Sequence, residues 1–288
     1  MKRKDFLRNS LLGAAGLGLS SNLGATPVKK EKSTYDKLME PVGFNHLPNK
    51  EIKTMKTVLH KADSRGHANH GWLNSHHSFS FANYYNPDRV HFGVLRVLND
   101  DVVAPGRGFG RHPHDNMEIV SIPLSGALEH KDSMDNKAVI KAGDVQVMSA
   151  GTGVMHSEFN DSDTNPVHFL QIWITPKVMG TKPRYEQKRI EQNGKLTPLV
   201  TADGRDGSLT MQQDASLYRL QLEANESIEL DLAKGYLHLI EGALTLSQVD
   251  GSSVEMKPGD GFGFSELTTV VADEPAHALL FELPADVH

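Results

Sequence analysis

The chain has 288 residues, of which 38% are hydrophobic and 23% are charged, a composition that excludes general disorder. Its net charge of −6 leaves no basic field for a phosphate backbone, so we expect no nucleic-acid partner. The absence of cysteine excludes disulfides, thiol catalysis and thiolate metal sites, whereas fifteen histidines are an unusually large supply of metal ligands. At about 150 residues per domain, the length suggests about two domains.

Residues 1–25 differ from the rest of the chain. A basic start is followed by the apolar stretch Leu11–Leu19 and by the small, polar segment Ser20–Ala25, which is the three-part layout of an export signal. The string RKDFLR resembles the twin-arginine signal, with Lys4 in place of the second arginine. The alternative is a basic tail or a short amphipathic helix. No apolar run is long enough to span a membrane.

We therefore predict a twin-arginine-like export signal over residues 1–25 and a linker over residues 26–50. The protein is expected to be exported or periplasmic if the signal is used, and cytoplasmic otherwise. The twin-arginine route carries folded proteins, so a metal could be inserted before export.

The remainder of the chain reads as β-rich, because short alternating or β-branched runs recur between turn residues such as Pro-Gly and Asp-Gly. Such spacing predicts an all-β sandwich or barrel. One short helix is expected at Tyr185–Gln192. The predicted strands are Phe92–Leu98, Glu118–Pro123, Asp144–Met148, Val167–Thr175, Leu217–Leu222, Tyr236–Ile240, Leu244–Val249 and Ala278–Leu283.

A two-part signal occurs twice in the chain. A Gly-Ala-Leu triplet starts at Gly126 and again at Gly242, and a Gly-Asp turn follows each at the same interval, at Gly143 and Gly259. Paired glycine turns of this kind recur in jelly-roll units. We therefore predict two duplicated domains, over residues 51–180 and 181–288, with a boundary in the stretch Lys177–Thr197.

Two histidine-containing pairs stand out in the first copy. His112 and His114 are two residues apart, as are His156 and Glu158, so each pair points to one face of a strand. If the two strands are neighbours, three imidazoles and a carboxylate meet in one volume. That donor set suits Fe, Mn, Cu, Ni or Zn and leaves open positions for substrate or dioxygen. The alternative is a pair of solvated, histidine-rich loops.

The second copy serves as an internal control. At the positions equivalent to the three histidines it has Ile228, Leu230 and Ala272. Histidine is therefore not required by the fold at these places. We expect the first copy to bind the metal and the second copy to be structural.

The chain resembles the pirin family of bicupins. The resemblance lies in the stretches RGHANHGWLNSHHSFSF, NPDRVHFGVLRVLNDDVVAPGRGFGRHPHDNMEIVSIPLSGALEHKDS and KAGDVQVMSAGTGVMHSEFN, and continues more loosely in the C-terminal half. It implies two jelly-roll cupin domains packed face to face, with one mononuclear metal ion, usually Fe(II), in the N-terminal domain. The family's ligands carry over onto His112, His114, His156 and Glu158.

The general cupin pattern is also present, as Gly106, His112, His114, Glu118 and Gly126, followed by Gly153, His156 and Asn160. This pattern would use Glu118 as the carboxylate ligand, whereas the pirin pattern uses Glu158. We follow the pirin pattern because its motif match is closer. Glu118 then becomes a residue near the ligands or in the pocket.

The resemblance implies a dioxygenase that opens quercetin, a flavonol, with dioxygen. The metal would bind the substrate hydroxyl, and Glu158 or Glu118 would take its proton as general base. The expected partners are a small phenolic substrate and dioxygen, and we expect a monomer. Candidate pocket side chains are Met117, Met148, Met155, Phe109 and Trp173, although core packing is the favoured interpretation of each.

Two alternatives to this enzyme stay open. One is a non-catalytic, iron-dependent regulator that binds protein partners through the redox state of its metal. The other is a metal-binding cupin with a different substrate. The histidines outside the two pairs are interpreted as structural (His67, His70, His76 and His77) or given no role (His130, His168, His238 and His277).

Overall fold

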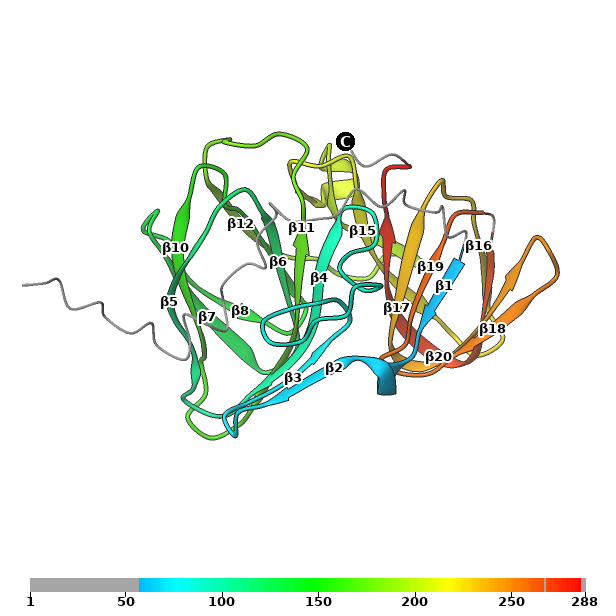
Figure 1. The fold of residues 1–288 in the computed structure, drawn as a ribbon, viewed down its shortest axis with the longest axis horizontal. Helices are drawn as coiled ribbons and strands as arrows, with labels where there is room; N and C mark the ends of the chain where they lie inside the picture. Colours follow the sequence, from blue (N-terminus) through cyan, green and yellow to red (C-terminus); the bar gives the residue numbers. More distant parts are fainter. Residues whose placement is uncertain (1–56, 267, 286–288) are drawn as a thin grey trace, which may run out of the picture. The chain divides into compact units, whose positions relative to one another are not determined.

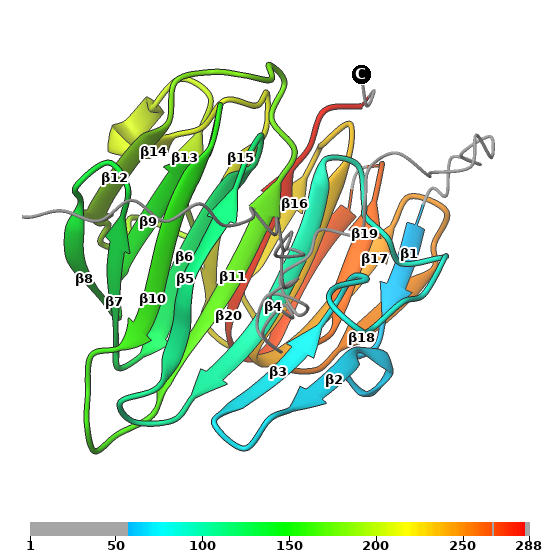
Figure 2. The same ribbon diagram turned by 60° about the vertical axis from the view of Figure 1, so that its left-hand side comes forward.

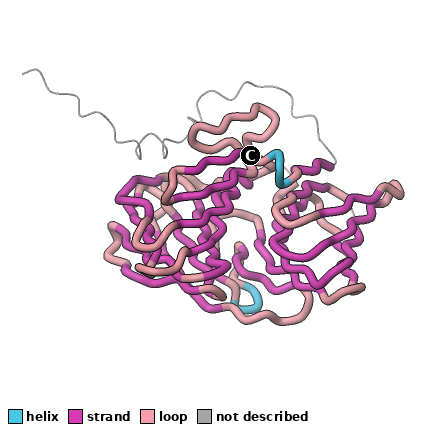
Figure 3. The backbone as a smooth tube through the Cα atoms, turned by 90° about the horizontal axis from the view of Figure 1, so that it is seen from below, coloured by secondary structure: helices cyan, strands magenta, loops and turns pink. Residues whose placement is uncertain are grey.

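The computed structural model describes residues 57–266 and 268–285, and these form an all-β protein (Figure 1). Within them the only helical segments are two short 3-10 turns, η2 (Ala62–Ser64) and η3 (Arg205–Gly207) (Figure 3). None of these residues forms a helix long and apolar enough to cross a membrane. The export signal over 1–25 and the linker over 26–50 lie outside the described residues and stay predictions.

The N-terminal half builds two sheets, one of seven and one of four strands (Figure 2). In spatial order, the larger sheet contains β12 (Arg184–Arg189), β9 (Asp144–Ser149), β6 (Glu118–Ser125), β11 (Val167–Ile174), β4 (Leu95–Val103), β3 (Leu73–His77) and β2 (Gly66–Asn69). The smaller sheet contains β5 (Gly108–His114), β10 (Val154–Asn160), β7 (Ala127–Asp132) and β8 (Lys137–Lys141).

The C-terminal half contributes most of a nine-stranded sheet. Its central path contains β1 (Thr57–His60), β19 (Gly261–Phe264), β17 (Gly235–Gln248), β20 (Thr268–Glu282), β15 (Ser216–Leu222), β13 (Leu196–Thr201) and β14 (Leu209–Thr210). Two further strands, β16 (Ser227–Leu230) and β18 (Ser253–Met256), pair with β20 and β17. Strands are exchanged across residue 180, the end of the predicted N-terminal domain. Strand β1 from the first half joins the nine-stranded sheet, and β12 from the second half joins the seven-stranded sheet.

The central strands of the seven-stranded sheet are covered on both faces, by the nine-stranded sheet on one side and by the four-stranded sheet on the other. On β11, Leu170 and Ile172 pack in one apolar cluster with Leu217 and Phe281 of the nine-stranded sheet, so the two sheets lie face to face as expected for a bicupin. On the other face of β11, Phe169 packs with residues of the four-stranded sheet. Gln171 is therefore directed into the space between the seven- and four-stranded sheets.

The repeated glycines have the same conformation in both halves. Gly126 and Gly242 have φ values of 77° and 85°, and a Cβ at either one would meet a proline carbonyl, at 3.1 Å and 2.2 Å. The second glycine of each pair also has positive φ. Glycine is favoured at such positions because a side chain there is strained. The internal repeat therefore marks glycines of similar conformation, although Gly126 lies between β6 and β7 and Gly242 lies inside β17 at a register shift.

The predicted helix over Tyr185–Gln192 is wrong, because Arg184–Arg189 form strand β12 at the edge of the seven-stranded sheet. Each residue of β12 pairs with one of β9, and Gln187 lies opposite Gln146. Most of the side chains of β12 are polar, so the pattern of hydrophobic residues could not distinguish the period of a helix from that of a strand. Backbone pairing with an open sheet edge outweighs a weak local helix preference.

Asp100 ties the segment before β2 to the large sheet. Its carboxylate accepts hydrogen bonds from Arg65 Nη1 at 3.1 Å and from His168 Nε2 at 2.6 Å. Burial by itself would raise the pKa of Asp100, but His168 and Arg65 outweigh it and hold that pKa below its ordinary value. A carboxylate with a depressed pKa stabilises the fold above its unfolded-state pKa, and this contribution is lost as the pH falls.

We expect Asp100→Asn to lower the free energy of unfolding at neutral pH by about 1.5–3 kcal/mol, the range for hydrogen bonds to charged groups. The difference from the wild type should shrink as the pH falls below about 4, because the carboxylate becomes protonated in the unfolded chain there while it is still charged in the folded protein. Urea unfolding of both proteins across this pH range measures it, with the exposed Asp231→Asn as control. Equal stability of Asp100→Asn and wild type at neutral pH would contradict the assignment.

Candidate metal centre

Strands β5 and β10 bring the two predicted pairs together. The strands are antiparallel neighbours in which His156 lies opposite His112, and Val154 lies opposite His114. Burial alternates along both strands, so His112, His114, His156 and Glu158 all point inward while Pro113 is exposed. The period of two that the sequence predicted for these residues is confirmed.

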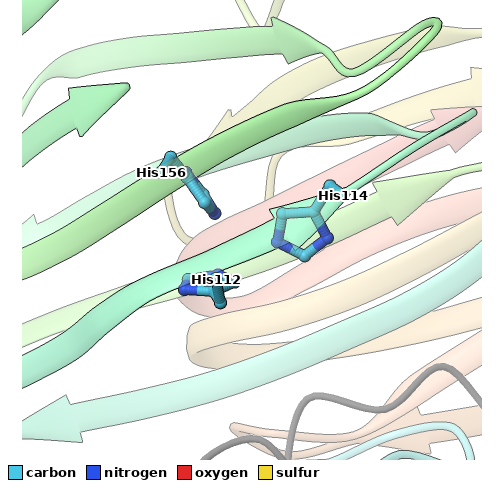
Figure 4. Close-up of side chains that lie close together, drawn as sticks. All are labelled: His112, His114 and His156. Atoms are coloured by element: carbon cyan, nitrogen blue, oxygen red, sulfur yellow. The ribbon is translucent and has the colours of Figure 1, made fainter. Parts of the chain in front are cut away.

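The three imidazoles form a compact, buried cluster (Figure 4). Their ring centroids are 4.3 Å apart for His112 and His156, 4.8 Å for His112 and His114, and 4.8 Å for His114 and His156. One nitrogen from each ring lies within 4.8 Å of the other two. We call this set the histidine triad.

Hydrogen bonding and burial keep the triad imidazoles neutral and leave ring nitrogens available to bind a cation. The Nδ1–H of His112 donates to the carbonyl of Gly110 at 2.7 Å, which leaves Nε2 as the basic nitrogen. Within the described residues, Nε2 of His114 and both ring nitrogens of His156 are buried without a hydrogen-bond partner. Burial lowers the pKa of His112 to about 4 and that of His114 to about 3, so both rings are neutral. Neutral imidazoles, with unbonded nitrogens on His114 and His156, fit a metal site.

Glu158 adjoins the triad through His156. The structure places ligand atoms of His130, His156 and Glu158 within 4.8 Å of one another, as a second cluster. The Glu158 carboxylate accepts hydrogen bonds from Ser121 Oγ at 3.1 Å and from Gln171 Nε2 at 2.9 Å. Burial raises the pKa of Glu158 to about 7, against the opposing effect of these two hydrogen bonds.

His130, for which the sequence predicts no role, lies beside the site. It is buried on β7 directly opposite Glu158, and Asp132 lies opposite His156. The Nε2 atom of His130 is 3.2 Å from a carboxylate oxygen of Asp132. The sequence contained a signal for this position. His130 and Asp132 lie two residues apart on β7, which is the same spacing as that of His156 and Glu158 on β10.

Glu118 has other partners. It is buried at the start of β6 and accepts hydrogen bonds from Ser149 Oγ at 2.7 Å and from the backbone N–H of Gln212 at 3.1 Å. Burial raises the pKa of Glu118, and these two hydrogen bonds oppose the rise. Neither cluster of ligating side chains in the described part of the chain includes Glu118.

A cavity that is partly open to solvent reaches Glu158. Aromatic side chains line it, including Trp72, Phe81, Phe109 and Trp173. The ring of Trp173 lies 4.9 Å from that of His114, so the cavity adjoins the triad. Of the five side chains considered from the sequence, Phe109 and Trp173 line the cavity. Met117 and Met148 instead pack in an apolar cluster, and Met155 is half-buried on β10.

The second half and the outlying histidines show which of the other predictions hold. Leu230 and Ala272 of the second half are buried in an apolar cluster against which Ile228 packs, in keeping with a structural second copy. His67 and His76 stack on each other at 4.6 Å on the surface strands β2 and β3. His77, in contrast, is buried and lines the cavity.

Gly108 allows β5 and β10 to approach each other at Glu158. A Cβ at this position would lie 2.3 Å from the carbonyl oxygen of Glu158 and 2.5 Å from Cα of Phe159. We expect Gly108→Ala to destabilise the protein by about 1–3 kcal/mol through overpacking and to lower its metal content. Thermal unfolding and elemental analysis measure both effects. Gly110→Ala is the matched control because a Cβ there meets nothing within 4 Å, and equal behaviour of the two variants would contradict the expectation.

The fold and the site define a bicupin with a histidine-based candidate metal centre in its N-terminal half. Residues 58–174 match the family model described as Pirin, and residues 199–283 match that of the quercetinase C-terminal cupin domain. The chain is 45% identical over 231 residues to the quercetin 2,3-dioxygenase of Escherichia coli K12, covering 78% of this chain and 98% of that protein. It therefore belongs to the pirin family.

Solved structures agree. A nickel(II) complex of the bacterial pirin YhhW from Escherichia coli is 44% identical and has a TM-score of 0.76, covering 80% of this chain and 100% of that chain. YhaK from Escherichia coli is 30% identical with a TM-score of 0.63, covering 76% of this chain and 98% of that chain. The chain is thus a homologue of proteins named quercetin 2,3-dioxygenase, with a buried histidine triad that suggests a metal site.

Proposed function

We propose that the protein is a metal-dependent dioxygenase that opens a flavonol of the quercetin type with dioxygen. The observation that carries the proposal is a cavity lined by aromatic rings that reaches Glu158 beside the buried histidine triad. The 45% sequence identity with the Escherichia coli quercetin 2,3-dioxygenase, in an alignment that covers 98% of that protein, supports it. Fold alone would not, since cupins host many chemistries.

His112, His114, His156 and Glu158 would hold one divalent metal ion. Three imidazoles and a carboxylate are compatible with Mn, Cu, Ni and Zn, and we propose Fe(II) because histidine and carboxylate sites that use dioxygen typically hold it. When bound, the metal supplies a Lewis acid that favours the deprotonated substrate hydroxyl.

The protein's own residues would orient the substrate and move its proton. Glu158 is the carboxylate that borders both the triad and the cavity, so we assign to it the removal of the proton from the reacting hydroxyl. Ser121 and Gln171 hold its carboxylate in place. Glu118 was the other candidate base, but its hydrogen bonds to Ser149 and Gln212 favour a structural role.

The cavity walls would hold a flat phenolic ligand and exclude water. Trp72 and Phe109 meet edge to face with centroids 5.4 Å apart, as do Phe81 and Trp173. Such rings present apolar faces and edges to a planar substrate.

Oxygen uptake with quercetin tests the proposal, using protein loaded with Fe(II) beside the metal-free protein. We expect uptake and carbon monoxide release that scale with metal content. Full metal loading without turnover of quercetin would overturn the proposal. It would instead favour the iron-dependent regulator, for which partner affinity should differ between Fe(II) and Fe(III).

A further inference from the structure

A row of polar side chains crosses the buried face of the seven-stranded sheet. Direct strand pairing joins His77 to Asn99, Asn99 to Gln171, Gln171 to Ser121, and Ser121 to Gln146. Residues paired in register lie side by side on the same face of a sheet. All five side chains are buried, and we call them the polar row.

The polar row has a part that serves the metal centre and a part that lines the cavity. Ser121 and Gln171 hydrogen-bond to the carboxylate of Glu158. Asn99 and His77, one and two strands further along, line the cavity, as does Asp101, the next inward-facing residue after Asn99 on β4. The row thus leads from Glu158 into the cavity wall.

Four residues that line this wall each have a buried polar atom without a hydrogen-bond partner within the described residues, and one of these atoms is Nε1 of Trp173. Oδ1 of Asn99, Oδ1 of Asp101 and Nδ1 of His77 are buried without a hydrogen bond within the described residues. Asn99 is 2% exposed, Asp101 4% and His77 3%. Folded proteins leave few buried polar atoms unsatisfied, because each one is destabilising. Four such atoms on the residues of one cavity wall indicate that a ligand, with water in its absence, completes hydrogen bonds there.

Resting on the proposed function, we propose that Asn99, Asp101 and His77 form a specificity subsite for the hydroxyl groups on the second phenolic ring of the flavonol. The substrate class is then a polyphenol that carries hydroxyls on the ring remote from the reacting one. Oxygen atoms of Asn99 and Asp101 accept hydrogen bonds from phenolic hydroxyls, and Nδ1 of His77 completes the set.

The spacing of the strands suits this assignment. Neighbouring strands lie about 4.8 Å apart, so Asn99 is about one strand spacing and His77 about two from Gln171, which holds Glu158. In a flavonol the second phenolic ring is attached next to the carbon that bears the reacting hydroxyl. With that hydroxyl at Glu158, the second ring extends along the polar row.

The test compares two flavonols: quercetin, which has two hydroxyls on its second ring, and galangin, which has none there. Anaerobic titration gives their dissociation constants for the Fe(II)-loaded protein, and oxygen uptake gives kcat/KM. For Asn99→Leu and Asp101→Leu we expect quercetin to bind and react at least about 10-fold less well, with galangin changed by less than about 2-fold, because a hydroxyl-binding site discriminates through its polar partners.

Two controls separate the subsite from a structural role. Asn74→Leu makes the same change on the opposite face of neighbouring strand β3 and should alter neither flavonol. Asn99→Leu should not lower the melting temperature of the ligand-free protein, because a buried oxygen without a partner is replaced by an apolar group of similar shape. Asp101→Asn, which retains an oxygen for Ser75, should recover part of the quercetin affinity.

The outcomes are distinguishable. Equal losses for quercetin and galangin, or no loss for either, would overturn the subsite while leaving the dioxygenase intact. A metal-loaded wild-type protein that neither binds nor oxidises either flavonol would overturn the proposed function and the subsite with it. Selective loss of quercetin supports both.

Discussion

Replacing His112 and His114 together with alanine is expected to abolish metal binding. The wild type should contain about one metal ion per chain, as a single His-rich centre predicts, and the double variant close to none. The change removes two of the three triad imidazoles and leaves His156, whose ring alone cannot enclose a cation. Elemental analysis of the two purified proteins, prepared in parallel, measures the effect.

The chain offers a matched control for this experiment. His67→Ala/His76→Ala also removes two histidines that contact each other, but these lie at the surface strands β2 and β3. It should leave the metal content unchanged. Full metal content in His112→Ala/His114→Ala would contradict the triad as the metal site. If that metal were then lost in His130→Ala, the cluster of His130, His156 and Glu158 would be the site.

Glu158→Gln should lower turnover of quercetin by about 10²–10⁴-fold, the usual contribution of a general base. The amide has the shape of the carboxylate and can still accept hydrogen bonds from Ser121 or Gln171, so the fold should survive. It cannot take the proton, and it is a weaker metal ligand. Steady-state oxygen uptake, with metal content measured on the same samples, separates loss of the base from loss of the metal.

Glu118→Gln is the comparison that decides between the two carboxylates. Glu118 is bonded to Ser149 and Gln212, so we expect its replacement to affect stability more than turnover. A large loss of turnover in Glu118→Gln with little effect of Glu158→Gln would reverse the assignment. The general cupin pattern would then describe this protein better than the pirin pattern.

Predictions from the sequence were accurate wherever a local period of hydrophobic or ligating residues was clear. Alternation along a strand placed His112 with His114, and His156 with Glu158, on inward faces, as the burial of both strands confirms. The repeated glycines were equally informative, because positive φ values restrict the choice of residue. At Tyr185–Gln192 polar side chains gave no clear period, and the helix predicted there is a strand.

By itself, then, the sequence determined the all-β class, the family and the inward-facing pairs, because motif and strand period are properties of neighbouring residues. The tertiary structure alone decided which strands are neighbours. It placed His130 opposite Glu158, bonded Glu118 to Gln212, and aligned His77, Asn99 and Gln171 in one row. These residues are far apart in the chain, and their meeting depends on strand order and register, which no local pattern encodes.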